Sequence, residues 1–229
     1  MTDFQRYAIY WAPEPGPLAE FGAAWLGWDA AHGIDREHPA LPGAPRPVAE
    51  LTDTPRKYGF HGTLKPPFRL VDGASAAGLH GAVERLAASL APVTLDGLAL
   101  HRLGGFLALV PTGDTAALEA LAAKAVQDLD PYRAALTPEA LMRRQSARLT
   151  DAQKALLDRW GYPYVMQEFR FHLTLTGALP EDEARTLEGL LAPVVAPLLP
   201  QPFVIRDICL FGEAGDGRFH ILHRYALSG

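Results

Sequence analysis

The sequence contains a single cysteine, Cys209, among its 229 residues. A lone thiol cannot form an intramolecular disulfide, which fits a reducing compartment. The chain also lacks a run of 18 apolar residues, which a membrane-spanning helix would require. Residues 1–20 hold Asp3, Glu14, Glu20 and several prolines but no long apolar core, so they do not resemble a signal peptide. We therefore expect a cytoplasmic protein with no membrane partner.

Positive charge is also in short supply. Lys and Arg number 21 against 26 Asp and Glu, which gives a formal net charge of −5 at pH 7. Proteins that track long nucleic acids are usually basic, so we expect no such partner. A small anionic substrate needs only a local positive pocket and remains compatible with this composition. The length suffices for one large domain or two small lobes around a real core.

Several motifs of nucleotide-dependent and nucleophilic enzymes are absent. The chain has no G-x-x-x-x-G-K-[ST] phosphate loop, no G-x-G-x-x-G dinucleotide motif and no G-x-S-x-G nucleophile turn. Cys209 falls in a predicted buried strand, which argues against a thiol nucleophile. We therefore expect no cofactor and no Ser or Cys catalytic triad.

Strand-like and helix-like hydrophobic patterns follow one another along the chain. A strand is predicted at 6–12, then a helix at 17–31 that ends at Gly33, then a proline-rich loop at 38–55. The next strand, in GFHGTLKPPF, is expected to stop at its two prolines. Further helices are predicted at 74–90, 114–129, 137–146, 150–160 and 180–199, and further strands at 93–103, 106–110, 169–177, 203–212 and 218–227.

The order strand–helix–strand–strand occurs twice, at 60–110 and again at 171–227. The spacing agrees as well, since His61 lies 33 residues before Thr94 and His172 lies 32 before Val204. We interpret this as a duplicated unit in a single bilobal domain of α+β class. The approximate lobes are 1–130 and 131–229, related by a pseudo-two-fold axis, with two antiparallel sheets facing each other.

The strings HGTL and HLTL give both units the same polar pair inside an apolar run. Because side chains two apart on a strand share a face, His61 lies beside Thr63 and His172 beside Thr174. A neutral imidazole can take a proton from a nucleophile, and a protonated one can give a proton to a leaving oxygen. The threonine hydroxyls can donate hydrogen bonds to phosphoryl oxygens. The pattern indicates cleavage or closure of a phosphodiester without a metal.

Positive side chains accompany both motifs. Strand parity aims Lys65 and Arg170, each two positions from a motif residue, at the same cleft, where they would neutralise charge in the transition state. Arg56, Lys57 and Arg69 extend the basic run around the first motif, which contains no acidic residue. We predict that Lys65, Arg170 and Lys57 contact an anionic substrate.

A histidine in an apolar run is more often a core residue than a catalytic one. Two such histidines in matched contexts, each with an in-phase threonine, favour the catalytic interpretation. A metal site is a further alternative. Neither motif carries a second histidine, a cysteine or a carboxylate at ligand spacing, so we expect no metal.

The two H-x-T-L motifs, one in each half of the chain, resemble those of the 2H phosphoesterase superfamily. The strings RKYGFHGTLKPPF and EFRFHLTLTG, with the opening RYAIYWAP, look like a bacterial branch linked by name to phosphonate metabolism. The resemblance covers essentially the whole chain. It implies a bilobal LigT-like fold with outer helices and catalysis without a metal. Carried over by motif position, it makes His61 and His172 the catalytic pair and Thr63 and Thr174 the phosphate-binding pair.

The resemblance implies a hydrolase of small cyclic phosphates, and its phosphonate branch implies 5-phosphoribosyl 1,2-cyclic phosphate as the substrate. One alternative is an RNA-end enzyme, either a 2′,3′-cyclic phosphodiesterase or a 2′–5′ ligase, against which the acidic net charge counts. Another is a non-catalytic protein that binds nucleotides or phosphorylated metabolites. The sequence leaves open which histidine is the acid and which the base. We expect a monomer, because both lobes belong to one chain.

Several other residues are candidates for contact with the substrate. Tyr58 has the wrong parity for the motif face, but it would reach the cleft if the strand began after Gly59. Tyr10 is placed to stack on a base or sugar. The basic stretch 142–148 is either a flap over the cleft or a solvated helix face, and we favour the solvated face. Roles stay open for Tyr162, Tyr164, Arg143, Arg144, His220 and His223.

Overall fold

The computed structural model describes residues 4–145 and 148–229. Within these residues a seven-stranded antiparallel sheet has the order β11 (Phe219–Ala226), β10 (Asp207–Glu213), β1 (Arg6–Trp11), β4 (Gly62–Phe68), β8 (Leu173–Thr174), β7 (Phe106–Thr112) and β6 (Gly97–Leu103). Two short pairs are separate from it: β2 (Trp28–Asp29) with β3 (Ile34–Asp35), and β5 (Val93–Leu95) with β9 (Phe203–Ile205).

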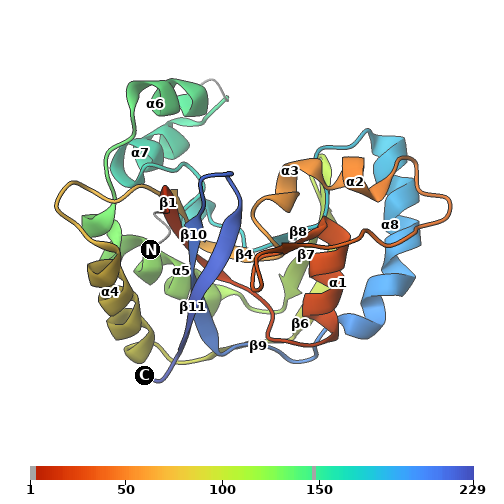
Figure 1. Ribbon diagram of the computed structural model, residues 1–229, viewed down its shortest axis with the longest axis horizontal. Helices are drawn as coiled ribbons and strands as arrows, with labels where there is room; N and C mark the ends of the chain where they lie inside the picture. Colours follow the sequence, from red (N-terminus) through yellow and green to blue (C-terminus); the bar gives the residue numbers. More distant parts are fainter. Residues whose placement is uncertain (1–3, 146–147) are drawn as a thin grey trace.

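Helices flank the strands on both sides, which confirms the predicted α+β class (Figure 1). On one side are α4 (Ala76–Ala88), α5 (Ala116–Asp128), α6 (Pro138–Gln145) and α7 (Asp151–Trp160). On the other are α1 (Pro17–Leu26), α2 (Val48–Leu51), α3 (Asp53–Arg56) and α8 (Glu181–Val195). Short 3-10 turns follow at η1 (Asp130–Tyr132), η2 (Met166–Glu168) and η3 (Ala196–Leu198). No helix in the described ranges is long and apolar enough to cross a membrane.

Three local predictions need correction. The first helix ends at Gly27 and not at Gly33, because Gly27 adopts the left-handed conformation (φ 77°) and its N–H closes the last turn. The loop expected at 38–55 contains α2 and α3. Strand β4 continues through Pro66 and Pro67. This is tolerated because β8 is too short to pair with that part of β4, so the missing N–H groups cost no hydrogen bond on that side.

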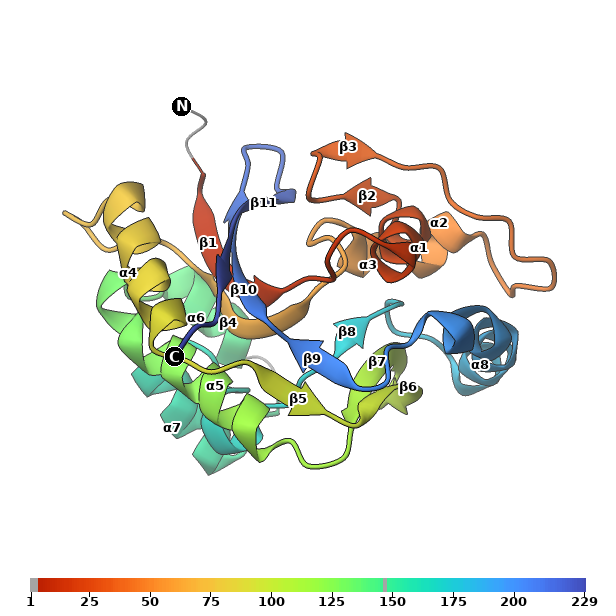
Figure 2. The same ribbon diagram turned by 90° about the horizontal axis from the view of Figure 1, so that it is seen from below.

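The order of elements repeats along the chain. The series β4-α4-β5-β6-β7 is followed, after α5 to α7, by β8-α8-β9-β10-β11. Equivalent strands pair with each other: β4 meets β8 at Gly62 and Leu173, and β5 meets β9 with Thr94 opposite Val204 (Figure 2). Thr94 and Val204 are the positions that the matched spacing of the sequence equates. Antiparallel pairing of equivalent residues is what a two-fold axis between two copies produces.

The two repeated units exchange elements across the sheet. Hairpin β6–β7 pairs with β8, and hairpin β10–β11 pairs with β1. Helix α4 packs on β10 and β11, and α8 packs on β6 and β7. The two predicted sheets are thus joined into one, because the equivalent strands β4 and β8 pair directly at its middle.

Strand β1 separates the main core from the face that carries the motifs. Tyr7, Ile9 and Trp11 point into the large core under the helices. Ala8, Tyr10 and Ala12 point the other way, into a smaller cluster with Trp28, Phe211 and Phe219. This alternation places the buried ring of Tyr10 directly beside the first motif.

Candidate active site

His61 lies immediately before β4 and is held by its own backbone. Its Nδ1–H donates to the carbonyl of Gly59 at 2.9 Å. Because a carbonyl can only accept, this hydrogen bond assigns the proton to Nδ1 and leaves a lone pair on Nε2. Nε2 lies 3.2 Å from Oγ1 of Thr63, so the first motif folds into one histidine–threonine unit.

His172 is held in the same way in the second motif. Its Nδ1–H donates to the carbonyl of Arg170 at 2.8 Å, again two residues earlier in the chain. The same tautomer follows, with Nε2 as the free acceptor. Both copies of the motif therefore leave Nε2 as the unprotonated nitrogen of the neutral ring.

Strand pairing brings the two motifs together. Gly62 is the partner of Leu173 in an antiparallel register, so His61 stands across from Thr174, and Thr63 across from His172. Side chains directly opposite each other in such a pair have Cβ atoms about 5 Å apart. A Cβ on Gly62 would lie 2.2 Å from the ring of Phe171, which explains the glycine between His61 and Thr63.

The surroundings of His61 and His172 lower the pKa of both rings, but not to the same extent. The His61 ring stacks on Tyr10 with centroids 3.8 Å apart, and loss of water lowers its pKa to about 4, with a smaller lowering from the charge of a protonated His172. Burial also lowers the pKa of His172, and the hydrogen bond to Arg170 opposes this. Both imidazoles are therefore neutral in the free protein at pH 7.

A cleft of about 610 Å³ opens over the first motif. Five of the candidate residues line it: Tyr10, Tyr58, His61, Thr63 and Thr174. The centroid of the Tyr58 ring is 6.0 Å from that of His61. His172 does not itself line this cavity, but its ring centroid lies 5.6 Å from that of Phe106, which does. In the described part of the chain, no group of three or more His, Cys, Asp or Glu side chains is placed to hold a metal ion.

The prediction that Lys65 points into the cleft is wrong. Thr63 pairs with Tyr10 but Lys65 pairs with the next residue, Ile9, so β4 has one extra residue there. This β-bulge turns Lys65 to the core face. Its ammonium is buried, donates to the carbonyl of Val126 at 2.9 Å, and its pKa is lowered to about 8 by that burial.

Arg170 and Lys57 also lie outside the cleft. Arg170 precedes the two-residue β8, so strand parity does not apply to it, and its exposed side chain lines a shallow surface pocket with His101. Only its carbonyl serves the site, through His172. The exposed Lys57 places Nζ 5.0 Å from the centroid of the Tyr58 ring and reaches the cleft only through that contact.

Two arginines of the basic stretch at 142–148 lie at the cleft, whereas Met142 and Arg148 of the same stretch are solvent-exposed. Arg143 and Arg144, from α6, line the cavity together with Tyr162. Residues 146–147 of this stretch lie outside the described residues. The cavity brings together parts of the chain that are distant in sequence. The local charge pattern therefore does not predict that Arg143 and Arg144 line it.

Arg6 also lines the cavity, although it was not among the residues predicted from the sequence. It lies on the same strand as Tyr10, four residues away and therefore with the same parity, a signal that could have revealed it. Of the remaining open residues, Tyr164 is exposed beside Tyr162, with ring centroids 5.7 Å apart. His220 packs near Trp28, and His223 near Tyr225.

Two solved structures resemble this chain in outline. One, described as the crystal structure of E. coli LigT complexed with 3′-AMP, is 20% identical, with 99% of this chain and 100% of that chain covered and a TM-score of 0.45. The other, described as the crystal structure of a phosphoesterase, is 18% identical, with 98% and 99% covered and a TM-score of 0.44.

Two curated proteins, both called ribose 1,5-bisphosphate phosphokinase PhnN, are closer in sequence. The one from Janthinobacterium sp. (strain Marseille) is 40% identical over 181 residues, which is 78% of this chain and 40% of that protein. The one from Laribacter hongkongensis (strain HLHK9) is 38% identical over 213 residues, 93% of this chain and 49% of that protein. The chain thus spans less than half the length of either relative. Since a family model matches residues 63–220, the chain belongs to the family described as protein of unknown function DUF1045.

Proposed function

We propose that this chain is a metal-independent phosphodiesterase that opens a small cyclic phosphate by two-histidine acid–base catalysis. The main support for the proposal is that both motifs hold their histidine in the same way. Each histidine is fixed by a carbonyl two residues earlier, and the paired strands set each histidine across from the other motif's threonine. A protein that only binds a phosphate would have little use for two matched proton-transfer groups.

In this mechanism His61 is the base and His172 the acid. The lowered pKa of His61 keeps Nε2 unprotonated, ready to take a proton from water as that water attacks phosphorus. The bond from phosphorus to the sugar oxygen breaks, and His172 gives that oxygen a proton. The anionic phosphate beside His172 would favour the charged imidazolium that this step needs. Thr63 and Thr174 donate hydrogen bonds to the non-bridging oxygens.

The substrate we propose is 5-phosphoribosyl 1,2-cyclic phosphate. Breaking its bond from phosphorus to O2 leaves the phosphate on O1, and the product is ribose 1,5-bisphosphate. That compound is part of the name of both curated relatives, ribose 1,5-bisphosphate phosphokinase PhnN. This chain has no phosphate loop of the G-x-x-x-x-G-K-[ST] type, so we do not assign it the kinase reaction of that name. A cavity of about 610 Å³ suits a ligand of this size.

We further propose that the enzyme works as a monomer in the cytoplasm, since both motifs of the cleft come from one chain. Tyr10 and Tyr58 would shield the sugar from solvent on one side of the cleft. Lys57 would contribute positive charge only at the edge of the cleft, next to Tyr58.

Phosphorus NMR of cyclic phosphates in excess chelator tests the proposal. The substrates are 5-phosphoribosyl 1,2-cyclic phosphate, a nucleoside 2′,3′-cyclic phosphate and ADP-ribose 1″,2″-cyclic phosphate. We expect turnover of the first in chelator, lost in His61→Ala and His172→Ala. The exposed His101 provides the control, and His101→Ala should match the wild type. Preferred turnover of the nucleoside compound would instead support the RNA-end enzyme, and no turnover of any compound would support a binding protein.

A further inference from the structure

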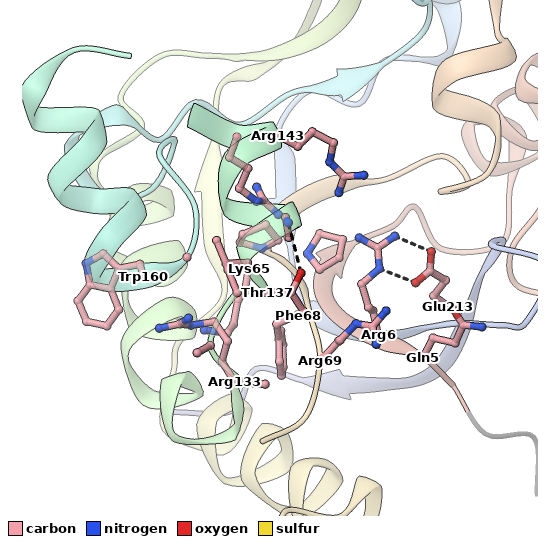
Figure 3. A pocket seen from close by; sticks show the side chains of 18 of the residues that line it. Gln5, Arg6, Lys65, Phe68, Arg69, Arg133, Thr137, Arg143, Trp160 and Glu213 are labelled. Carbon is pink, nitrogen blue, oxygen red and sulfur yellow. Dashed lines mark hydrogen bonds and ion pairs between the residues drawn. The ribbon is translucent and has the colours of Figure 1, made fainter. Parts of the chain in front are cut away.

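A second cavity, of about 480 Å³, opens beside the candidate active site (Figure 3). The two cavities share one wall, made of Pro66 and Pro67 from β4, Arg6 from β1, and Arg143 and Arg144 from α6. The two cavities are therefore adjacent, and the residues of this wall line both of them.

The second cavity is strongly cationic in a chain whose net charge is negative. Its described lining includes six basic side chains, from Arg6, Lys65, Arg69, Arg133, Arg143 and Arg144. The same lining includes only two carboxylates, from Glu139 and Glu213. An excess of this kind in a concave site focuses positive potential and attracts small anions.

Part of this charge is already neutralised. Arg6 makes a two-armed ion pair with Glu213, with both contacts at 2.5 Å. Arg133 pairs with Asp130 at 2.6 Å, and the buried Lys65 lies 3.8 Å from the same carboxylate. Glu213 therefore offsets the charge of Arg6 on the shared wall, and Asp130 offsets charge at Arg133 and Lys65.

Arg144 gives the clearest indication that a hydrogen-bond acceptor is missing from the part of the chain that the structure describes. Its Nε is buried and has no hydrogen-bond partner among the described residues, while its guanidinium lies 4.9 Å from the centroid of the Tyr162 ring. Burial lowers the pKa of Arg144, and the charges of Arg143 and Arg6 lower it further. Buried guanidinium groups normally find acceptors, so an anion beside Arg144 would supply the acceptor that its Nε lacks among the described residues.

We propose that Arg6, Arg143 and Arg144 form a second phosphate site, so that the substrate is a cyclic phosphodiester that also carries a phosphomonoester. The proposal rests on the function assigned to the cleft above. Arg6 and Tyr10 lie four residues apart on β1, about 13 Å along the strand, and the arginine side chains shorten this span. A single phosphorylated pentose can therefore reach both sites. Guanidinium groups hold a phosphate through paired, charge-assisted hydrogen bonds.

The test compares two substrates that differ only in the second phosphate: 5-phosphoribosyl 1,2-cyclic phosphate and ribosyl 1,2-cyclic phosphate. The variants are Arg144→Gln and Arg143→Gln, and Arg185→Gln, on the exposed face of α8, is the control. We expect kcat/KM for the phosphorylated compound to fall about 10- to 100-fold in each cleft variant, at least ten times more than for the other compound. Equal losses on both substrates, or the same loss in Arg185→Gln, would overturn the proposal.

A binding measurement separates this proposal from the proposed function. Ribose 5-phosphate is titrated calorimetrically into wild type, Arg144→Gln, Arg143→Gln and Arg185→Gln. We expect at least tenfold weaker binding to the two cleft variants alone. If no cyclic phosphate is hydrolysed but this pattern holds, the phosphate site stands and the catalytic proposal fails. Equal affinity in all four proteins overturns the phosphate site, whatever the activity.

Discussion

In both copies of the histidine motif, Nδ1–H donates to a carbonyl two residues earlier, but the two rings lie in different surroundings. His61 is followed by the seven-residue β4, and its ring rests on the buried Tyr10 with centroids 3.8 Å apart. His172 is followed by a strand of only two residues, and its ring lies beside Phe106, with centroids 5.6 Å apart. Duplication supplies two equivalent histidines, and the unequal packing then gives them different proton affinities, which is what an acid and a base require.

Removal of either histidine is expected to have the largest effect on activity. We expect His61→Ala and His172→Ala each to lower kcat by about 10²- to 10⁴-fold, because each removes one proton transfer. The double variant should lose little more than the worse single variant, since the two groups act in one step. Steady-state kinetics on the preferred cyclic phosphate measures this. Losses that multiply in the double variant would show that the histidines act independently.

Replacement of the threonines should lower activity less than removal of the histidines, and by different amounts in the two motifs. Thr63→Val removes a hydroxyl that lies 3.2 Å from Nε2 of His61, as well as a donor for the phosphate. Thr174→Val removes the donor alone. We expect losses in kcat/KM of about 10- to 100-fold for Thr63→Val and about tenfold for Thr174→Val. The reverse order would place the more demanding role in the second motif.

The pH dependence of kcat/KM should reveal the unequal pKa values. A base acts when unprotonated, so activity rises with pH through the lowered pKa of His61, at about 4. An acid acts when protonated, so activity falls as His172, whose pKa lies below its ordinary 6.5, loses its proton. We therefore expect a bell-shaped profile with its maximum below about pH 6.5. A maximum above pH 7 would contradict this assignment of roles.

The smallest effect on activity is expected at Lys65, which the bulge removes from the cleft. Lys65→Met should change kcat/KM by no more than about threefold. The effect should appear in stability instead. The folded state holds Lys65 at a pKa of about 8, so between pH 8 and 10.5 the unfolded chain binds more protons and the wild type gains stability as the pH rises. Denaturant unfolding across that range should show this gain reduced in Lys65→Met. A loss of activity like that of Thr63→Val would place Lys65 at the substrate.

Much of the site can be predicted from the alternation of side chains between the two faces of a strand. This alternation depends only on neighbouring residues and can therefore be read from the sequence. The spacing of His61 and Thr63 places both on the cleft side, and the matched spacing of the two units equates Thr94 with Val204, which the structure pairs. The same rule fails at Lys65 because one extra residue reverses the alternation. It fails at Arg170 because the strand begins too late to include it.

The sequence by itself determined the duplicated motif, the order of the elements, the α+β class and the candidate residues His61, His172, Thr63, Thr174, Tyr10 and Tyr58. These depend on residue types and on short-range periodicity. Only the tertiary structure decided that the two units exchange hairpins, that α6 lies over the cleft, and that Arg6 meets Arg143 and Arg144. Those arrangements are set by packing between segments that are far apart in the chain, such as β7 with β8 and β1 with β10, which no local pattern in the sequence records.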